Sequence, residues 1–316
     1  MTNNLIFISF GNLKIHCQNL FSVLSAIFYY KKEENKFGIS IYTDNPAFFK
    51  KWLLSYDFVN YCLINNDLLT TWKGEYNYIF RVKIKAIEHS VENLKGKILY
   101  LDGDTFFTDS PEKIFNKIEP GHTVMYTKEG CFCDPDFKNW ECIRQHMKNN
   151  KFTSENNTFI FPLEQHMWNA GVIGINYTDK LLLDLVLDLT DQYCSQVSSN
   201  AYHQDQVMFS YIFQNKSMLH SAEQSVFHYC YGTRKAHMFK ILKDFFRKNI
   251  MSEPDRLLQE VYKISKTPVP DGPITKSLYD RVILFVTKRR FGFFLAIDRV
   301  RKSKNLLSFF DRGRKY

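Results

Sequence analysis

The chain has 316 residues, of which 45% are hydrophobic and 16% aromatic, and this content excludes a largely disordered protein. The length suits one large catalytic domain with an appendage, or two modest domains. The formal net charge is +9, and residues 276–316 hold twelve Lys and Arg against three Asp, so the excess positive charge belongs to the C-terminal tail.

Seven cysteines are scattered along the chain. An odd number without regular spacing argues against a disulfide framework and for a reducing compartment. The first apolar run, residues 5–10, follows no basic segment and is too short for a signal peptide or a membrane span. We therefore expect a cytoplasmic protein.

Strand and helix patterns alternate through the first hundred residues. Short apolar runs bounded by turn residues predict strands at 5–10, 37–42, 59–64 and 98–101. Helical spacing predicts helices through 20–28, after Pro46 and over 76–91. Such alternation with short connections indicates an α/β fold, with a mostly parallel sheet flanked by helices.

After residue 111 the alternation becomes less regular. The patterns predict strands at 122–126 and 172–175, helices at 139–148, 181–193 and from 203, and a polar loop at 149–157. We expect a catalytic domain at residues 1–249 and a helical extension at 250–316.

The apolar run at residues 98–101 ends abruptly in Asp102-Gly103-Asp104. Such a run is typical of a buried parallel strand, and open α/β sheets bind ligands at the carboxyl edge, where these acids would lie. Because side chains of an extended segment repeat every two residues, Asp102 and Asp104 should face the same side, and Gly103 lets a ligand approach the backbone. Two hard oxygen ligands suit Mg²⁺ or Mn²⁺ carrying a diphosphate.

An Asp-x-Asp triplet also arises by chance, so an acidic turn without a ligand is the alternative interpretation. A second triplet, Asp134-Pro135-Asp136, follows no apolar run and contains a proline that is typical of a turn. The difference in context favours Asp102 and Asp104 as the functional pair.

Four features in chain order carry a resemblance to a known family. They are Tyr100-Leu-Asp-Gly-Asp104 at a strand end, Asn169-Ala-Gly171 before a strand, Asp205-Gln206 at a helix start, and His228 followed by Gly232 and Lys235. Together they resemble the metal-dependent GT-A glycosyltransferases, most of all the retaining branch that includes glycogenin and bacterial lipopolysaccharide glycosyltransferases. The resemblance covers roughly residues 4–240 and implies a Rossmann-like nucleotide-diphospho-sugar transferase domain.

The resemblance implies a role for each site residue. Asp102, Asp104 and His228 would ligate the metal, and the imidazole favours Mn²⁺ over Mg²⁺ because it is a softer ligand than a carboxylate. Asp205 and Gln206 would be the catalytic residues near the anomeric carbon. The implied donor-binding residues are Asp44, Arg81, Lys83, Asp102, Asn169, Gly171, Gly232 and Lys235. The family places its glycine three and its lysine six residues after the histidine, whereas these spacings are four and seven here.

Each of these residues also has an interpretation without chemistry. His228 lies among aromatic residues and could be a hydrogen-bonded core histidine. Asn169 and Asp44 could occupy turns, and Asp205-Gln206 could cap a helix, where an acid is favourable with the helix dipole. The remaining pair, Arg81 and Lys83, could form a solvated helix face.

The tail combines apolar residues with basic clusters. Lys288-Arg289-Arg290 interrupts the apolar pattern, so the segment cannot span a bilayer. Its apolar and basic residues instead indicate an amphipathic helix on an anionic membrane surface, which would place residues 276–316 against the cytoplasmic face of a membrane. A helix that packs on its own domain is the alternative. Nucleic acid is not expected as a partner, because the basic residues alternate with aliphatic side chains more than with stacking aromatic ones.

We therefore expect transfer of a sugar from a nucleotide-sugar donor, UDP-linked, to a saccharide or lipid-linked acceptor of a surface glycan such as lipopolysaccharide or capsule, with retention of configuration. If the reaction inverts, Asp205, Glu164 or Glu223 would act as the base. Two other classes remain open. A nucleotidyltransferase would use the same carboxylates but release pyrophosphate, and a non-catalytic membrane adaptor would tolerate loss of both aspartates.

Overall fold

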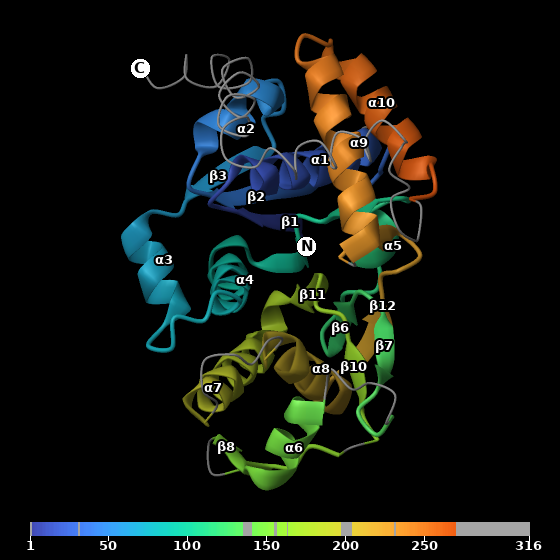
Figure 1. Ribbon diagram of the computed structural model, residues 1–316. Coiled ribbons are helices and arrows are strands. Elements are labelled where there is room, and N and C mark those ends of the chain that lie inside the picture. The colour runs from blue at the N-terminus through green and yellow to red at the C-terminus, as the bar shows by residue number, and fades with distance from the viewer. Residues whose placement is uncertain are drawn as a thin grey trace, which may run out of the picture. The chain divides into compact units, whose positions relative to one another are not determined.

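The computed structural model describes most of the first 269 residues. The described ranges are 2–30, 32–134, 141–154, 157–162, 164–196, 204–230 and 232–269. The basic tail at 276–316 lies outside them, so its expected amphipathic helix is a prediction only. Within the described ranges, a central sheet is covered by helices on both faces (Figure 1).

The sheet has seven strands in the order β12-β6-β11-β4-β1-β2-β3. The bounds of the strands are β1 Thr2–Ser9, β2 Phe37–Thr43, β3 Val59–Leu63, β4 Gly96–Leu101, β6 His122–Met125, β11 Val172–Asn176 and β12 Met218–Ser221. Strands β1 to β4 run parallel, β12 runs parallel to β6, and β11 is antiparallel to both of its neighbours, β4 and β6. The predicted α/β fold with a mostly parallel sheet is confirmed.

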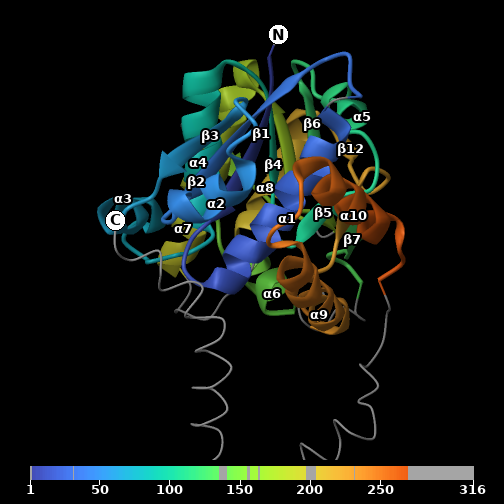
Figure 2. The same ribbon diagram turned by 90° about the horizontal axis from the view of Figure 1, so that it is seen from above.

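Two groups of helices cover the two faces of the sheet (Figures 1 and 2). One face carries α1 Leu13–Tyr30, α2 Pro46–Leu53, α9 Gly232–Asn249 and α10 Pro254–Lys266; the other carries α4 Arg81–Leu94, α7 Lys180–Gln196 and α8 Gln204–Lys216. Shorter helices are α3 Asn66–Lys73, α5 Glu112–Phe115 and α6 Glu141–Asn149. Leu5 and Phe7 of β1 join the core cluster of α1, and Ile6 joins that of α4, because side chains alternate along a strand.

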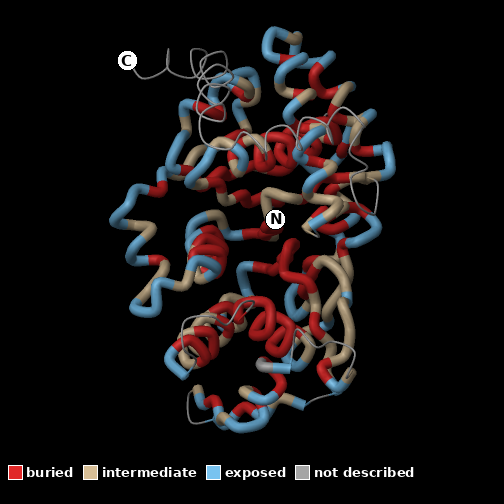
Figure 3. Tube along the Cα trace, in the orientation of Figure 1, coloured by how far each residue is buried: buried red, intermediate tan, exposed pale blue. Residues whose placement is uncertain are grey.

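Helix α1 is buried on nearly all sides, from His16 to Tyr29 (Figure 3). It lies between the sheet and the outer helices α9 and α10. The ring of Phe21 packs edge to face on Phe106 and on Phe245, with centroids 5.6 Å apart in both pairs. A helix that is covered all round is typically apolar, and α1 is largely so, although it also buries Gln18, Asn19, Ser22 and Ser25.

Two segments differ from their sequence-based predictions. The helix expected over 76–91 begins only at Arg81, because Gly74 and Asn77 have positive φ angles that a helix cannot accommodate. The polar segment 149–157, predicted as a loop, contains β8 Phe152–Ser154 and the first residue of β9 Asn157–Phe159, and these two strands pair. Phe152 is fully buried, so one apolar residue anchors an otherwise polar segment.

Four further short strands lie outside the main sheet and carry residues of the site. They are β5 Thr105–Phe107, β7 Lys128–Cys131, β10 His166–Trp168 and β13 Val226–His228. β5 pairs antiparallel with β13, and β7 with β10.

The cysteines of the described ranges include one disulfide, between Cys131 and Cys133. Four others, Cys17, Cys62, Cys194 and Cys230, are free. A bridge across one intervening residue closes no large loop, so it does not link separate elements as a disulfide framework would. No helix in the part of the chain that the structure describes is long and apolar enough to cross a membrane.

Helix α10 lies beyond the predicted domain boundary at residue 249 and packs on α1. Leu257, Leu258 and Val261 are buried in the same core cluster as α1. Tyr262 stacks on Phe28 with ring centroids 4.3 Å apart. The division of the chain at 249 and 250 stays a prediction, and it can be tested by truncation.

A chain shortened to residues 1–249 should be less stable than one shortened to residues 1–269 by about 3 kcal/mol or more. Removal of α10 exposes apolar surface of α1, and burial of each aliphatic side chain contributes about 1.5 to 3 kcal/mol. Urea unfolding followed by tryptophan fluorescence measures the difference. Equal midpoints for the two chains would show that α10 is an appendage, as the boundary at 249 predicts.

Candidate active site

The two carboxylates of the Asp-Gly-Asp triplet lie at the carboxyl edge of the sheet. β4 ends at Leu101, and Asp102 and Asp104 lie in the turn between β4 and β5. The antiparallel pairing of β5 and β13 sets His228 opposite Thr105, directly beside Asp104. Residues 124 positions apart in the sequence thus meet through one short strand pair.

Asp102, Asp104 and His228 form the one group of three potential metal ligands found among the described residues, and their ligand atoms all lie within 4.8 Å of one another. Bonds of about 2.1 Å place opposite ligands of one ion about 4.2 Å apart, so side-chain shifts under about 1 Å would bring all three onto one ion. Two carboxylates and an imidazole suit Mn²⁺ by their chemistry. The donor set therefore fits a divalent cation.

The ring of His228 is held on both sides. Its Nε2 lies 3.2 Å from Asp104 Oδ1, and its Nδ1 lies 2.9 Å from Asn169 Oδ1. The same Asn169 oxygen accepts the backbone N–H of Gly171 at 2.9 Å. A Cβ atom on Gly171 would lie 2.3 Å from His228 Cε1, so only glycine lets the ring lie here.

Gly103 is required for a similar reason. A Cβ atom at this position would lie 2.3 Å from Nδ2 of Asn19, on α1. The close approach of the turn to α1 holds the two aspartates against the buried helix. The middle residue of the triplet therefore has a packing role, in addition to any approach of a ligand.

Lys235 reaches Asp104 from the first turn of α9, which begins at Gly232. Its Nζ lies 2.6 Å from Asp104 Oδ2, and its side chain is 42% exposed. The extra residue between His228 and Lys235 therefore does not keep the lysine from the carboxylates. Burial raises the pKa of Asp104, but the hydrogen bonds and charges of His228 and Lys235 outweigh it and hold that pKa well below its usual value.

Burial lowers the pKa of His228, but its hydrogen bonds to Asp104 and Cys230 and the charges of these two groups outweigh this effect and raise the pKa to about 10. His228 is only 4% exposed. It is thus a buried, hydrogen-bonded histidine and also a member of the ligand cluster. The two interpretations that the sequence leaves open describe the same side chain.

Lys83 lies in the centre of the site and joins two of its acids. Its Nζ lies 3.4 Å from Asp102 Oδ1, 3.2 Å from Asp205 Oδ2 and 3.1 Å from the backbone oxygen of Ala170. Burial lowers the pKa of Lys83, but the charges of Asp102 and Asp205 outweigh it, so the net shift is upward. The solvated helix face that the sequence allowed is thus excluded for Lys83.

Asp205 is engaged at both carboxylate oxygens. Oδ2 faces Lys83, and Oδ1 accepts the hydroxyl of Tyr78 at 2.8 Å. The residue is 2% exposed. It lies in the first turn of α8, where an acid is favourable with the helix dipole, but the partners of its carboxylate are side chains of the site.

Gln206 and Asn169 share a partner that the sequence analysis did not identify, Glu129 on β7. One carboxylate oxygen of Glu129 accepts from Asn169 Nδ2 at 2.7 Å, and the other accepts from Gln206 Nε2 at 2.8 Å. The segment around Glu129 has no apolar pattern that would predict a strand. No sequence signal marked this residue.

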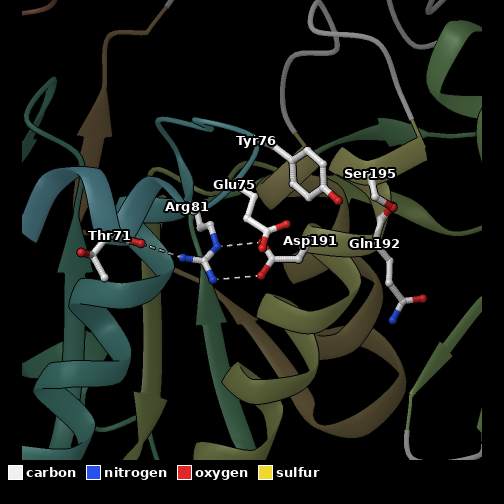
Figure 4. A pocket seen from close by; sticks show the side chains of 8 residues that line it. Thr71, Glu75, Tyr76, Arg81, Asp191, Gln192 and Ser195 are labelled. Carbon is white, nitrogen blue, oxygen red and sulfur yellow. Dashed lines mark hydrogen bonds and ion pairs between the residues drawn. The ribbon is translucent and has the colours of Figure 1, made fainter.

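Arg81 contacts a different part of the protein. Its guanidinium donates to both oxygens of Asp191, at 2.7 and 2.9 Å (Figure 4). It also donates to the backbone oxygen of Trp72 at 3.0 Å. Positions two residues apart on a helix point about 200° apart, which explains why Arg81 and Lys83 diverge. The cavity beside Arg81 measures about 420 Å³ and is lined by Thr71, Gly74, Glu75, Tyr76, Arg81, Asp191, Gln192 and Ser195.

The remaining predicted residues lie around this arrangement. Asp44, at the end of β2, accepts the backbone N–H of Gly11 at 2.8 Å and lies 3.4 Å from His16 Nε2. Gly232 is the first residue of α9. Glu223 accepts a hydrogen bond from the hydroxyl of Thr127, and Glu164 is exposed. The structure thus brings together Asp102, Asp104, Lys83, Asn169, Asp205, Gln206, His228 and Lys235.

Of the comparisons with known proteins, the one with solved structures finds matches. No protein-family model and no curated protein matches the sequence. Among solved structures, the galactosyltransferase LgtC in complex with donor and acceptor sugar analogs matches with a TM-score of 0.51 and 14% sequence identity, over 85% of this chain and 98% of that chain. Mouse xyloside xylosyltransferase 1 matches with a TM-score of 0.47 and 14% identity, over 70% of this chain and 85% of that chain. The LgtC match confirms a GT-A-like fold, and at this identity it shows the fold alone.

Lys83→Met should lower the free energy of unfolding by about 3 kcal/mol, because it leaves the buried carboxylate of Asp205 without its ammonium partner. The double variant Lys83→Met/Asp205→Asn should recover part of this loss. Lys85→Met, on the same helix, is the matched control and should cost under about 1 kcal/mol, since Lys85 pairs with Glu88 nearer the surface. Urea unfolding provides the measurement. Equal losses for the two lysine variants would contradict a buried ion pair.

Proposed function

We propose that the protein is a metal-dependent glycosyltransferase that moves a sugar from a nucleotide-sugar donor to a saccharide or lipid-linked acceptor. The observation that carries this proposal is the meeting of Asp102, Asp104 and His228 at the carboxyl edge of a sheet whose fold is shared with a galactosyltransferase. Ligands of open α/β sheets bind at that edge. The proposal takes the donor to be UDP-linked.

The three ligand residues would hold Mn²⁺ or Mg²⁺. When bound, the ion acts as a Lewis acid that neutralises the charge developing on the departing diphosphate. Lys235 is the protein's own contribution to that charge. Its ammonium lies on the same carboxylate as His228, on a half-exposed side chain that can turn toward a phosphate.

Asp205 is proposed to stabilise positive charge on the sugar. Both of its oxygens are engaged and the residue is buried, so it is poorly arranged to take a proton from an acceptor hydroxyl. A fixed negative group near the anomeric carbon favours an oxocarbenium-like state. This supports a retaining reaction with front-face attack, in which Gln206 helps to position the donor. If the reaction inverts, Glu223 and Glu164 are the better candidates for the base.

The other donor-binding assignments extend from this centre. Asn169 and Gly171 would lie at the sugar, Gly232 at the phosphates, and Asp44 at the nucleotide base, where it follows the parallel strand β2. Arg81 stays a prediction as a donor-binding residue. Its guanidinium is already engaged by Asp191, and it would have to leave that pair to reach a diphosphate.

The acceptor is proposed to belong to a surface glycan such as lipopolysaccharide or capsule. The basic tail at 276–316, outside the described residues, would bring the enzyme to a lipid-linked acceptor at the cytoplasmic face of a membrane. Basic residues near an anionic surface contribute about 1 kcal/mol each.

Asp104→Ala should abolish Mn²⁺-dependent hydrolysis of a UDP-sugar and leave the fold intact, because it removes one of three ligands and the partner of Lys235. Release of UDP from a panel of UDP-sugars, with and without EDTA, measures the effect. Asp109→Ala is the matched control, since Asp109 is a more exposed acid nearby that pairs with Lys113. Unchanged turnover in Asp104→Ala would remove the metal from the mechanism, and release of pyrophosphate from a nucleoside triphosphate would favour a nucleotidyltransferase.

The donor can be identified by thermal unfolding. Among nucleotide-sugars tested with Mn²⁺, the true donor should raise the melting temperature of the chain most, because a ligand that binds only the native state stabilises it. The gain should vanish in Asp104→Ala. A gain that survives in that variant would place the donor elsewhere.

The full chain should sediment with vesicles that contain anionic lipid, and a chain ending at residue 275 should not. The truncation removes twelve basic residues and the whole positive excess. Vesicles of neutral phosphatidylcholine serve as the control for the electrostatic part of binding. Equal sedimentation of the two chains would contradict a membrane-binding tail.

A further inference from the structure

We propose that Glu129 is a positioning residue, which fixes the side-chain amides of Asn169 and Gln206 and, through Asn169, presents the Nε2 atom of His228 to the metal. This inference rests on the proposed metal-dependent function. Its starting point is that the two oxygens of Glu129 face two different amide groups, at 2.7 and 2.8 Å. These two amides belong to residues that the sequence already marked as part of the site.

The direction of the hydrogen bonds follows from the chemistry of the partners. An ionised carboxylate only accepts hydrogen bonds, so the amide atoms that face Glu129 must be the NH₂ groups. The oxygens then face the other way. Asn169 Oδ1 accepts the backbone N–H of Gly171 at 2.9 Å, and Gln206 Oε1 accepts that of Ala170 at 3.3 Å. Backbone N–H groups only donate, so both ends of each amide independently demand the same orientation.

The orientation of Asn169 determines which nitrogen of His228 is free. Because Asn169 Oδ1 only accepts, Nδ1 of His228, at 2.9 Å, must carry the hydrogen. Without an ion Nε2–H donates to Asp104 Oδ1 at 3.2 Å, and a metal ion would take the place of this hydrogen rather than of Nδ1–H, which Asn169 holds. Rotation of the amide of Asn169 by half a turn would place NH₂ against Nδ1 and favour the hydrogen on Nε2. In that form the ring could not bind the ion through Nε2.

Burial makes this chain of hydrogen bonds effective. Asn169 is 6%, Gln206 9% and His228 4% exposed, so water cannot easily replace a lost partner. An unsatisfied buried amide costs about 1 to 3 kcal/mol. These hydrogen bonds also connect four elements: β7, the turn before β11, α8 and β13. The carboxylate of Glu129 therefore holds Asn169 and Gln206 directly, and His228 through Asn169.

The first test is Glu129→Gln in the full-length protein. A glutamine presents one NH₂ group, so one of the two amides that face it loses its acceptor. We expect the dissociation constant for Mn²⁺, measured from the electron paramagnetic resonance of free Mn²⁺ at fixed pH, to rise about tenfold, as for other partners of metal ligands. Glu119→Gln is the matched control and should leave the constant unchanged, since Glu119 is an exposed acid paired with Lys97, at the start of β4.

The second test exchanges the carboxylate of Glu129 and the amide of Asn169 between the two positions. In Glu129→Gln/Asn169→Asp, the glutamine NH₂ donates to one oxygen of the new aspartate and the glutamine oxygen accepts from Gln206. The other oxygen of the aspartate still accepts from Nδ1–H of His228. The net charge is the same as in the unchanged protein, and Mn²⁺ affinity should return to within about threefold of it. Circular dichroism and urea unfolding confirm that each variant is folded.

Each result has one meaning. Unchanged Mn²⁺ affinity in Glu129→Gln, or no recovery in the double variant, would overturn the positioning role while the unchanged protein still binds Mn²⁺. No Mn²⁺ binding by the unchanged protein would overturn the proposed function and this inference together. Restored affinity without restored UDP release would show that Asn169 or Glu129 also acts on the substrate, and the positioning role would stand.

Discussion

The antiparallel pairing of β5 with β13 is the constraint on which the rest of the site depends. It joins residue 104 to residue 228 through a few backbone hydrogen bonds, such as that from Tyr229 N–H to Asp104 O at 3.1 Å. Alone, a pair of three-residue strands would be marginal in water. Here Phe106 packs against Phe21 of the buried helix α1, so the core holds the pair in place. The histidine and the aspartates are therefore aligned by packing that involves no functional group.

Charge pairing explains why so many ionisable groups can share this space. Asp102 and Asp205 face Lys83, and Asp104 faces His228 and Lys235. Carboxylates this close to one another in a poorly hydrated site repel unless cations separate them. The site is thus arranged around alternating charges, and a divalent cation with a diphosphate would extend the same alternation. The shared fold by itself would not require this, because folds host many reactions and the chemistry lies in the side chains.

Uncharged amide groups fix the orientation of side chains in the site. The amides of Asn169 and Gln206 have oxygens that face backbone donors and NH₂ groups that face Glu129. A buried network in which every group is satisfied is rigid, because any rotation leaves a donor facing a donor. Such a network can orient a histidine ring more strictly than a charge can, since hydrogen bonds depend on angle. The acids attract cations, and the amides fix the orientation of the histidine ring.

Much of this could be predicted from the sequence, and the missing part has one physical reason. Apolar runs and helical spacing predicted the strands β1 to β4 and the helices α1, α2 and α4 between them, and the strand end at Leu101 located Asp102 and Asp104. The sequence alone could not separate Lys83 from Arg81, tell whether His228 was a core residue or a ligand, or identify Glu129. Periodicity reports which face of its own element a residue lies on, whereas a site depends on which elements meet. Only the tertiary structure decided that β13 meets β5 and that β7 faces α8, because those meetings are set by packing between segments far apart in the chain.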